Sequence, residues 1–293
     1  MTSNTFLTPH QVSRALGVSE SSLKRWCDKG LVETVRTAGG HRRVPYEAVV
    51  RFLRETGHEV VRPDVLGLPA AVGQGSTVLD RAVKQLHAAL VAGDEAVIRR
   101  ILLDLYLARH PLWQIGDEVL APALHAVGSS WQCGEIDVYQ ESRGCELVQR
   151  ALFELVARIP SPAGAAPRAI GGTLAGDAYR IAGLLCEAAL RESGWNAESL
   201  GSSLPAESIE QAVADLRPRL LWLSVSHFDD PDETLRRINR LAKRVRKCGT
   251  TVAIGGRLVD DAFAARLRGC VCCRSLKDLI EVAERATAAD RPS

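Results

Sequence analysis

The chain has 293 residues and a formal net charge of +2, so it is long enough for about two or three domains and its overall charge names no partner. No apolar run approaches the roughly 18 residues that cross a membrane, and the N-terminus lacks the pattern of a signal peptide. We therefore expect a cytoplasmic protein with no membrane partner. The eight cysteines are expected to be reduced thiols, and the cluster at 270–273 has no second cluster with which to hold a metal ion.

Two short helices are predicted near the N-terminus. Thr8 is a typical helix-capping residue, Gln11 is placed to complete a capping box, and Gly17 is placed to end the helix. Ser19 then caps a second helix after a tight turn. Residues 1–57 carry nine Lys and Arg against five Asp and Glu, so this end of the chain is expected to meet an anion.

A basic hairpin is predicted after the two helices. Gly39 and Gly40 permit a tight tip between basic residues, and a third helix begins near Tyr46. This order is typical of a winged helix-turn-helix, in which the second helix enters the major groove and the wing lies along the phosphates. The helix pair taken alone would also fit an ordinary helical hairpin.

The segments VSESSLKRWCDKGL and RTAGGHRR, followed by an aromatic residue, resemble the MerR family of transcription regulators over nearly all of residues 5–57. The resemblance implies that the second helix and the wing bind double-stranded operator DNA. Members of that family act as dimers on paired half-sites, so a dimer or a larger assembly is implied. The DNA-contacting residues that it implies are Lys24, Arg25, Arg36, His41, Arg42 and Arg43.

A helical bundle is predicted between two linkers rich in Pro, Gly and Ala, at 58–75 and 160–167. Leu79 and Leu86 belong to an apolar pattern with helical spacing, and Gly and Pro residues divide residues 76–159 into about four segments. We expect a four-helix bundle there.

The last part, residues 168–293, alternates five short apolar or β-branched runs with helical segments. This pattern predicts a doubly wound parallel sheet, whose ligand crevice lies at the C-terminal ends of the strands. The crevice would be formed by residues 174–183, 224–230 and 254–258. A basic helix is expected at 232–248, either as a solvated outer face or as a second surface that contacts phosphates.

The order of a MerR-type reader, a helical bundle and a parallel sheet resembles the CarH/LitR group of light-responsive repressors over essentially the whole chain. In that group a helical cap covers a corrin ring held on a flavodoxin-like domain. Adenosylcobalamin keeps the tetramer on DNA in the dark, and light breaks its cobalt–carbon bond. The resemblance therefore implies a fold of winged helix-turn-helix, four-helix bundle and flavodoxin-like sheet, and a cobalamin-type pocket.

The cap residues that the group places over the corrin ring are only partly present. Trp131 is followed after nine residues by Glu141, as in the group, but Ser142 stands where a histidine would follow. Gln132 replaces the histidine that ligates cobalt after illumination in the group's best-known members. Trp131 could instead be a core aromatic of the bundle, and Glu141 a solvated helix carboxylate.

The lower signature of the group, an acid, any residue and then the histidine that ligates cobalt, reads Asp177-Ala178-Tyr179 here. A phenol must lose a proton with a pKa of about 10 before it ligates a metal strongly, whereas neutral imidazole is a ready donor. The positions implied to accommodate the ring and the nucleotide tail are kept as Ser224, Ser226, Gly255 and Gly256.

Three interpretations of this module remain open. It could bind cobalamin without a protein ligand to cobalt, it could bind another tetrapyrrole such as a bilin, with Cys133, Tyr179 or His227 newly involved, or it could be a ligand-free scaffold for oligomerisation and protein contacts. The same module also serves corrinoid-dependent methyltransferases, which would need the axial histidine and would have no use for a wing. The phosphate-binding GxxxxGK, the GxSxG elbow and the HExxH helix are all missing from the sequence. We expect a DNA-binding repressor and not an enzyme.

Overall fold

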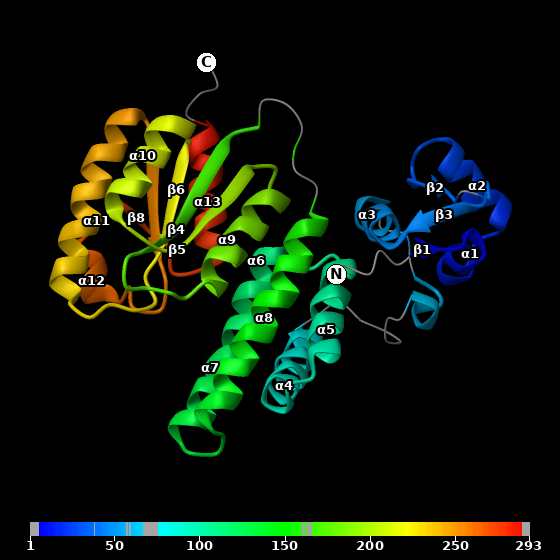
Figure 1. The fold of residues 1–293 in the computed structure, drawn as a ribbon, viewed down its shortest axis with the longest axis horizontal. Coiled ribbons are helices and arrows are strands. Elements are labelled where there is room, and N and C mark those ends of the chain that lie inside the picture. The colour runs from blue at the N-terminus through cyan, green and yellow to red at the C-terminus, as the bar shows by residue number, and fades with distance from the viewer. Residues whose placement is uncertain are drawn as a thin grey trace.

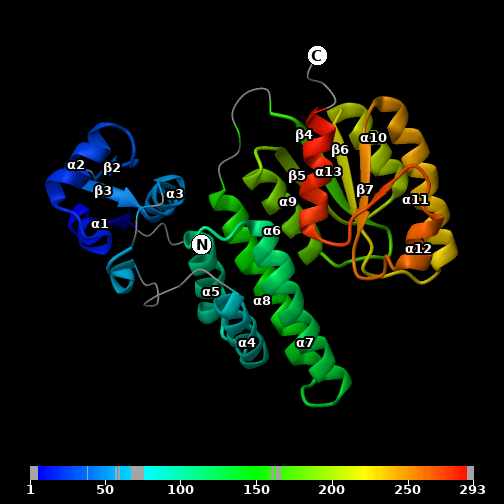
Figure 2. The same ribbon diagram turned by 180° about the vertical axis from the view of Figure 1, so that it is seen from behind.

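The computed structural model of the chain describes residues 6–37, 39–56, 58, 60–66, 76–159, 162 and 166–288. Much of the two predicted linkers, 58–75 and 160–167, lies outside the described residues, and the exact domain boundaries stay predictions. Figures 1 and 2 show an N-terminal part, a helical bundle and an α/β part, with the bundle between the other two.

The N-terminal part has three helices and a small antiparallel sheet of strand order β1-β3-β2. The predicted caps are confirmed: the Gln11 amide donates to Thr8 Oγ1, the Ser22 amide donates to Ser19 Oγ, and Gly17 ends the first helix with a φ of 65°. Its elements are β1 (Phe6–Leu7), α1 (Pro9–Leu16), α2 (Glu20–Asp28), β2 (Val35–Arg36), β3 (Arg42–Pro45), α3 (Tyr46–Thr56) and the 3-10 turn η1 (Pro63–Leu66).

The prediction of about four helical segments in residues 76–159 is confirmed. The third of them runs from Leu112 to Gln132 and changes from α to π geometry and back just before Pro122, whose ring nitrogen has no hydrogen to donate. The bundle elements are α4 (Ser76–Ala92), α5 (Glu95–Leu107), α6 (Leu112–Gln114), the π segment η2 (Ile115–Leu120), α7 (Ala121–Gln132) and α8 (Val138–Arg158).

The α/β part is a five-stranded parallel sheet of order β5-β4-β6-β7-β8, which confirms the predicted doubly wound, flavodoxin-like fold. The central strand β6 is buried at every position because helices cover both faces. Its elements are β4 (Arg168–Leu174), α9 (Ile181–Glu192), β5 (Asn196–Leu204), α10 (Ala206–Leu216), β6 (Leu220–Ser224), α11 (Pro231–Val245), η3 (Arg246–Cys248), β7 (Thr251–Gly255), α12 (Asp261–Arg266), β8 (Val271–Cys272) and α13 (Leu276–Ala288).

Helix α9 joins the α/β part to the bundle. Its buried residues Ile181, Leu184 and Leu185 belong to the same apolar cluster as the bundle core, while Leu190 packs with the sheet. Helices α9 and α13 cover the face of the sheet that is turned toward the bundle, and α10, α11 and α12 cover the other face (Figure 1). The predicted crevice therefore lies where the C-terminal strand ends meet the bundle.

Candidate functional site

Helix α2 presents two of the predicted DNA-contacting residues to solvent. Leu23 is fully buried in the N-terminal core, while Lys24 and Arg25, on the next positions of the helix, are exposed. In both views α2 and β2 lie farther from the α/β part than α3 does (Figures 1 and 2). The helix is therefore accessible to a duplex.

The wing is the hairpin between β2 and β3. The Thr37 amide donates to the His41 carbonyl at 2.9 Å, and Gly40 has a φ of 75°, which a glycine adopts without strain. Arg36 and His41 are exposed and Arg43 is half-buried. The structure thus places all four predicted wing residues on one hairpin, where each is at least partly accessible.

The fourth wing residue, Arg42, has a partner within the protein. Its Nη2 donates to Asp28 Oδ1 at 2.8 Å, and its side chain is 26 % exposed. Asp28 is the last residue of α2, so the pair ties the wing to the helix that precedes it. Sequence reasoning gave Arg42 a direct DNA contact and missed this internal ion pair, since the two residues are 14 positions apart.

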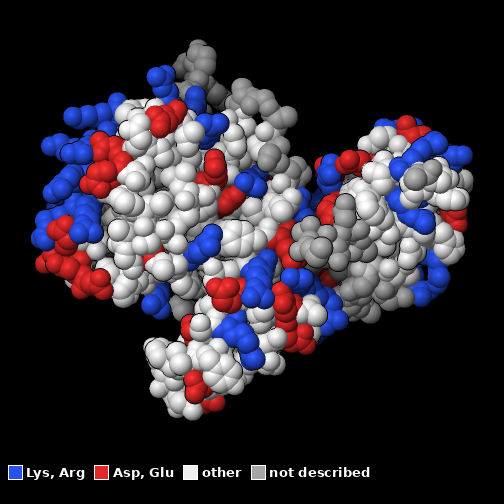
Figure 3. All heavy atoms as spheres, viewed as in Figure 1, with Lys and Arg blue, Asp and Glu red and all other residues white. Residues whose placement is uncertain are grey.

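The basic helix predicted at 232–248 is α11, and its arginines have acidic neighbours. Lys and Arg side chains crowd the left edge of the molecule in Figure 3, mixed with Asp and Glu. Arg236 and Arg237 both pair with Glu233, and Arg244 pairs with Glu210 at 2.7 Å. Interspersed charges of both signs are typical of a solvated helix face and do not favour a second phosphate-binding surface.

Asp177 is buried at the floor of the crevice, where it connects two loops. Its Oδ1 accepts a hydrogen bond from the Tyr179 amide at 3.0 Å. Its Oδ2 accepts from the amides of Ser226 at 2.6 Å and His227 at 3.2 Å. The acid of the cobalamin signature therefore has a structural use here that needs no cofactor, because it fixes the loop after β4 to the loop after β6.

Tyr179 lies between the bundle and the sheet, close to Glu141, Cys145 and Arg257. Burial raises the pKa of the Tyr179 phenol above its ordinary value, the negative charges of Glu141, Asp177 and the ionised form of Cys145 act in the same direction, and Arg257 opposes them. The pKa of Cys145 is also raised, to about 12, first by burial and then by Glu141, whose Oε1 accepts the thiol hydrogen at 3.4 Å. The phenol and the thiol are therefore both protonated near neutral pH.

The other predicted cap residues do not gather around Tyr179. Trp131 is 46 % exposed near the end of α7, so the alternative that it is a core aromatic is wrong. Gln132 and Ser142 are exposed as well, whereas Glu141 is half-buried and acts on Tyr179 through its charge. Sequence reasoning missed Arg257, which follows Gly255 and Gly256 and donates from Nε to the Ser226 carbonyl at 2.9 Å.

The residues implied to accommodate the nucleotide tail are packed against the protein itself. Ser224 and Ser226 are 5 % and 3 % exposed, and their hydroxyls lie 3.4 Å apart. A Cβ at Gly255 would lie 2.8 Å from the Cys273 carbonyl oxygen, and one at Gly256 would lie 2.5 Å from the Val225 carbonyl oxygen. Close backbone contacts thus explain both glycines without a ligand.

Trp222 fills the space beneath these serines, on the face of β6 that is turned toward α9 and α13. The side chain is 2 % exposed, and its ring occupies the position that a Cβ at Gly171 would need. Its indole Nε1 is buried without a hydrogen-bond partner among the described residues. The sequence alone could not indicate that Gly171 on the neighbouring strand makes room for this ring.

These residues do not fit a cobalamin held through its cobalt. The phenol of Tyr179 keeps its proton, and the buried face of β6 is filled by an indole ring. The cavity that Tyr179 lines together with Arg180 and Glu187 has a volume of about 60 Å³, which is room for a few water molecules. Within the described ranges, no group of three or more His, Cys, Asp or Glu side chains is arranged to hold a metal ion.

Comparison with known proteins finds similarities in the first two parts of the chain. Residues 6–57 match the family model described as a helix-turn-helix domain, and residues 82–155 match the one described as a B12 binding domain. The HTH-type transcriptional repressor CarH of Myxococcus xanthus is 31 % identical over 176 residues, which cover 59 % of this chain and 55 % of CarH. The repressor CarA of the same organism is 25 % identical over 256 residues and 84 % of each chain.

The chain is similar to both repressors and has a helix-turn-helix domain at its N-terminal end. The match spans about half the length of CarH, whereas the match to CarA spans most of both chains. A monomethylamine corrinoid protein of Methanosarcina barkeri is similar in structure, with a TM-score of 0.57 and 18 % identity over 70 % of this chain and 97 % of that one. At that identity the likeness shows the fold alone, so this chain shares a cap-and-sheet architecture with that protein. No helix of the described parts is long and apolar enough to cross a membrane.

Proposed function

We propose that this protein is a DNA-binding transcription regulator that represses its target genes. The observation that carries the proposal is the winged helix-turn-helix, whose α2 and wing turn basic side chains outward at one end of the molecule. Both similar Myxococcus proteins are named transcriptional repressors, which supports repression over activation. The DNA contacts that we propose are made by Lys24, Arg25, Arg36, His41 and Arg43, with Arg42 holding the wing on α2.

We further propose that the bundle and the sheet act as a protein scaffold that controls self-association, as a dimer or a tetramer. Asp177, Gly255 and Gly256 each have a partner or a steric reason within the chain, so their presence does not depend on a cofactor. The protonated Tyr179 argues against cobalt ligation from below, and the buried Trp222 argues against a nucleotide tail beneath Ser224 and Ser226. Cobalamin held without a protein ligand and another tetrapyrrole are the alternatives.

We propose no catalytic role. The likeness to the monomethylamine corrinoid protein is a likeness of fold, and the residue that replaces the axial histidine keeps its proton. An exposed basic wing would also have no role in a methyltransferase subunit.

The DNA-binding proposal predicts that Arg25→Ala and Arg43→Ala each weaken binding to duplexes that the wild-type protein selects from a random-sequence pool. Loss of a wing contact to a phosphate, as in Arg43→Ala, lowers affinity for all sequences alike and reduces the slope of log affinity against log salt by about 1. Loss of Arg25, on the helix that enters the major groove, is expected to relax the sequence preference as well. Fluorescence anisotropy over a range of salt concentrations measures the affinity and the slope.

Arg236→Ala is the matched control for that experiment. Arg236 is an exposed arginine on α11, on the opposite side of the molecule from α2, and it pairs with a neighbouring glutamate. Its loss is expected to leave affinity and salt slope unchanged. A wild-type protein that selects no duplex, or Arg25→Ala and Arg43→Ala variants that bind as the wild type does, would contradict the proposal.

A further inference from the structure

The N-terminal part is docked on the bundle through α3. Val50 of α3 is 2 % exposed and belongs to the apolar core of the bundle, while Leu103 and Leu107 of α5 pack against the core of the N-terminal part. Apolar packing of this kind is not directional, so by itself it does not fix the angle between the two parts.

Arg54, in the last turn of α3, adds directional contacts at the edge of this packing. Its Nη1 donates to the Tyr106 carbonyl at 2.8 Å, and its guanidinium lies 4.4 Å from the centre of the Tyr106 ring. Its Nη2 forms an ion pair with Glu192 Oε1, and the two side chains are 17 % and 19 % exposed. Because the pair is largely shielded from water, loss of either charge would leave the other one buried without a partner.

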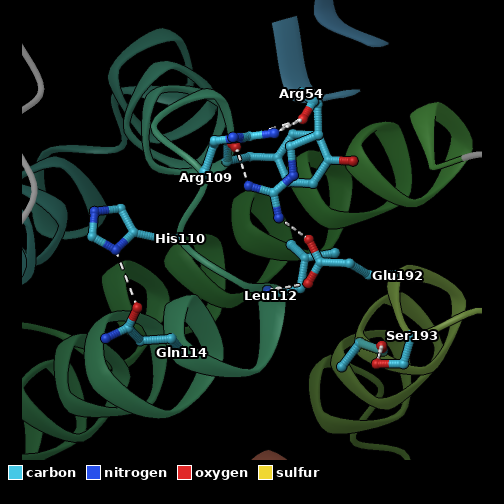
Figure 4. Close-up of polar contacts among 9 residues, drawn as sticks. Arg54, Arg109, His110, Leu112, Gln114, Glu192 and Ser193 are labelled. Atoms are coloured by element: carbon cyan, nitrogen blue, oxygen red, sulfur yellow. Dashed lines mark hydrogen bonds and ion pairs between the residues drawn. The ribbon is translucent and has the colours of Figure 1, made fainter. Parts of the chain in front are cut away.

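Glu192 connects all three parts of the chain, as Figure 4 shows. It is the last residue of α9 in the α/β part, and its Oε1 holds Arg54 of the N-terminal part. Its Oε2 accepts a hydrogen bond at 2.6 Å from the amide of Leu112, the first residue of α6 in the bundle. The preceding residue, Pro111, supplies no side-chain cap to that helix, so the carboxylate satisfies an amide that would otherwise lack a partner.

Arg109 makes a second connection from an unfavourable backbone conformation. It follows α5 with a φ of 67°, a left-handed conformation that usually selects glycine and costs other residues about 1–2 kcal/mol. Its guanidinium donates to the Arg54 carbonyl at 2.9 and 3.3 Å and to the Glu55 carbonyl at 3.4 Å. These carbonyls belong to the last turn of α3, where a cation is favourable. The contact with α3 is a physical reason for an arginine where glycine would fit better.

We propose that Arg109 and Glu192 are positioning residues for DNA binding, which hold the N-terminal part in one orientation on α5 and α9. This inference rests on the proposed function. In the held orientation α2 and β2 lie farther from the α/β part than α3 does, so the docked state is the one that is ready to bind DNA. Helix α9 begins two residues after Tyr179 and ends at Glu192, so one helix of 12 residues joins the crevice to the contact with Arg54. A shift of α9 at the crevice would therefore reach the DNA-binding end.

The test compares Arg109→Gly with Arg217→Gly in the full chain. Arg217 ends α10 with a φ of 46°, so the two substitutions relieve the same kind of backbone strain, but Arg217 lies in the α/β part away from α3. Both variants are expected to keep or raise the temperature of unfolding. Arg109→Gly alone is expected to speed hydrogen exchange at the amides of 50–56 and to lower affinity for the selected duplex by about fivefold or more.

Glu192→Ala is expected to have the same effects as Arg109→Gly on hydrogen exchange and on duplex affinity. It removes the acidic partner that α9 provides for Arg54. The positioning role is overturned if Arg109→Gly and Glu192→Ala match Arg217→Gly in both exchange and affinity while the wild type binds its duplex. A wild type that selects no duplex overturns the DNA-binding function and the positioning role with it, so the two failures are distinguishable.

Discussion

At the scale of single residues, Asp104 is a buried acid at the contact between α5 and the N-terminal part. Burial raises its pKa to about 7, with Arg100 acting in the opposite direction. Its charge in turn helps to raise the pKa of Tyr46, the first residue of α3, although burial of that phenol is the larger cause. The folded protein therefore holds a proton on Asp104 at a pH where the unfolded chain has released it.

The sign of the resulting pH dependence follows from the raised pKa. The folded-state value lies above the unfolded value, which is about 4, so the folded state binds more protons between roughly pH 4 and 7. The contribution of this group to the free energy of unfolding is therefore most favourable below about pH 4. It is lost as the pH rises through the folded-state pKa of about 7.

We predict that Asp104→Asn removes this dependence. The variant is expected to be more stable than the wild type by about 1–3 kcal/mol near pH 8, with little difference near pH 4, because the amide has no charge to bury. Urea unfolding at several pH values measures the effect. Asp80→Asn, on an exposed position of α4, is the control and is expected to leave the profile unchanged. A parallel pH profile for Asp104→Asn and the wild type would be inconsistent with a buried titrating acid.

Residue types were easier to predict from the sequence than residue environments. The sequence indicated that Tyr179 is a poorer cobalt ligand than histidine, because a phenol must lose its proton before it ligates a metal strongly. It could not indicate that Cys145 and Arg257 are its neighbours, since those contacts join α8 to the loop after β7. The positive φ of Arg109 also left no signal, because nothing local in the sequence requires it.

At the scale of elements, the sequence predicted the helices and strands well where the apolar pattern was long. The five strands of the α/β part and their alternation with helices were predicted, and the basic helix expected at 232–248 corresponds to α11 and η3. The two-residue strand β1 was not predicted, because it forms by pairing with β3 and has no pattern of its own. The π segment η2 was missed for a similar reason, since it keeps a helical apolar spacing.

Strand β6 carries the element-scale feature that bears most on function, the filling of its buried face by Trp222. The pairing of Gly171 with Trp222 in adjacent strands places the bare backbone of β4 opposite the indole ring. The missing side chain at Gly171 therefore makes room for the indole ring of Trp222. The ring in turn fills the space over Gly171 that would otherwise be a cavity.

We predict that Gly171→Ala and Trp222→Leu are strongly coupled. Gly171→Ala alone is expected to lower the free energy of unfolding by about 1–3 kcal/mol, because its Cβ would overlap the ring. In the Trp222→Leu background the same change is expected to have a much smaller effect. A double-mutant cycle by urea unfolding measures the coupling. Gly128→Ala, with nothing within 4 Å of its Cβ on α7, is the control and is expected to be neutral or stabilising. Additive effects of the first two changes would contradict the packing argument.

At the scale of the whole molecule, the three parts are joined at two places by contacts of different kinds. The bundle and the sheet share an apolar core through α9, and the N-terminal part is held by α3, Arg54 and Arg109. This arrangement keeps the DNA-binding end connected to the crevice although the crevice does not fit a cobalt-ligated cofactor. Regulation through self-association or a protein partner would use the same connections.

Our last prediction is that the protein is indifferent to adenosylcobalamin and to light. After incubation with the cofactor and desalting, we expect no visible absorption above that of the buffer control, because Tyr179 stays protonated and Trp222 fills the buried face of β6. Light scattering and duplex affinity are expected to be the same with and without the cofactor, in the dark and after illumination. A retained corrin spectrum would contradict the scaffold proposal, and a retained bilin spectrum in a parallel incubation with biliverdin would favour the other tetrapyrrole. Neither result would bear on the proposed DNA contacts, because the Arg25→Ala and Arg43→Ala variants test those contacts independently of the crevice.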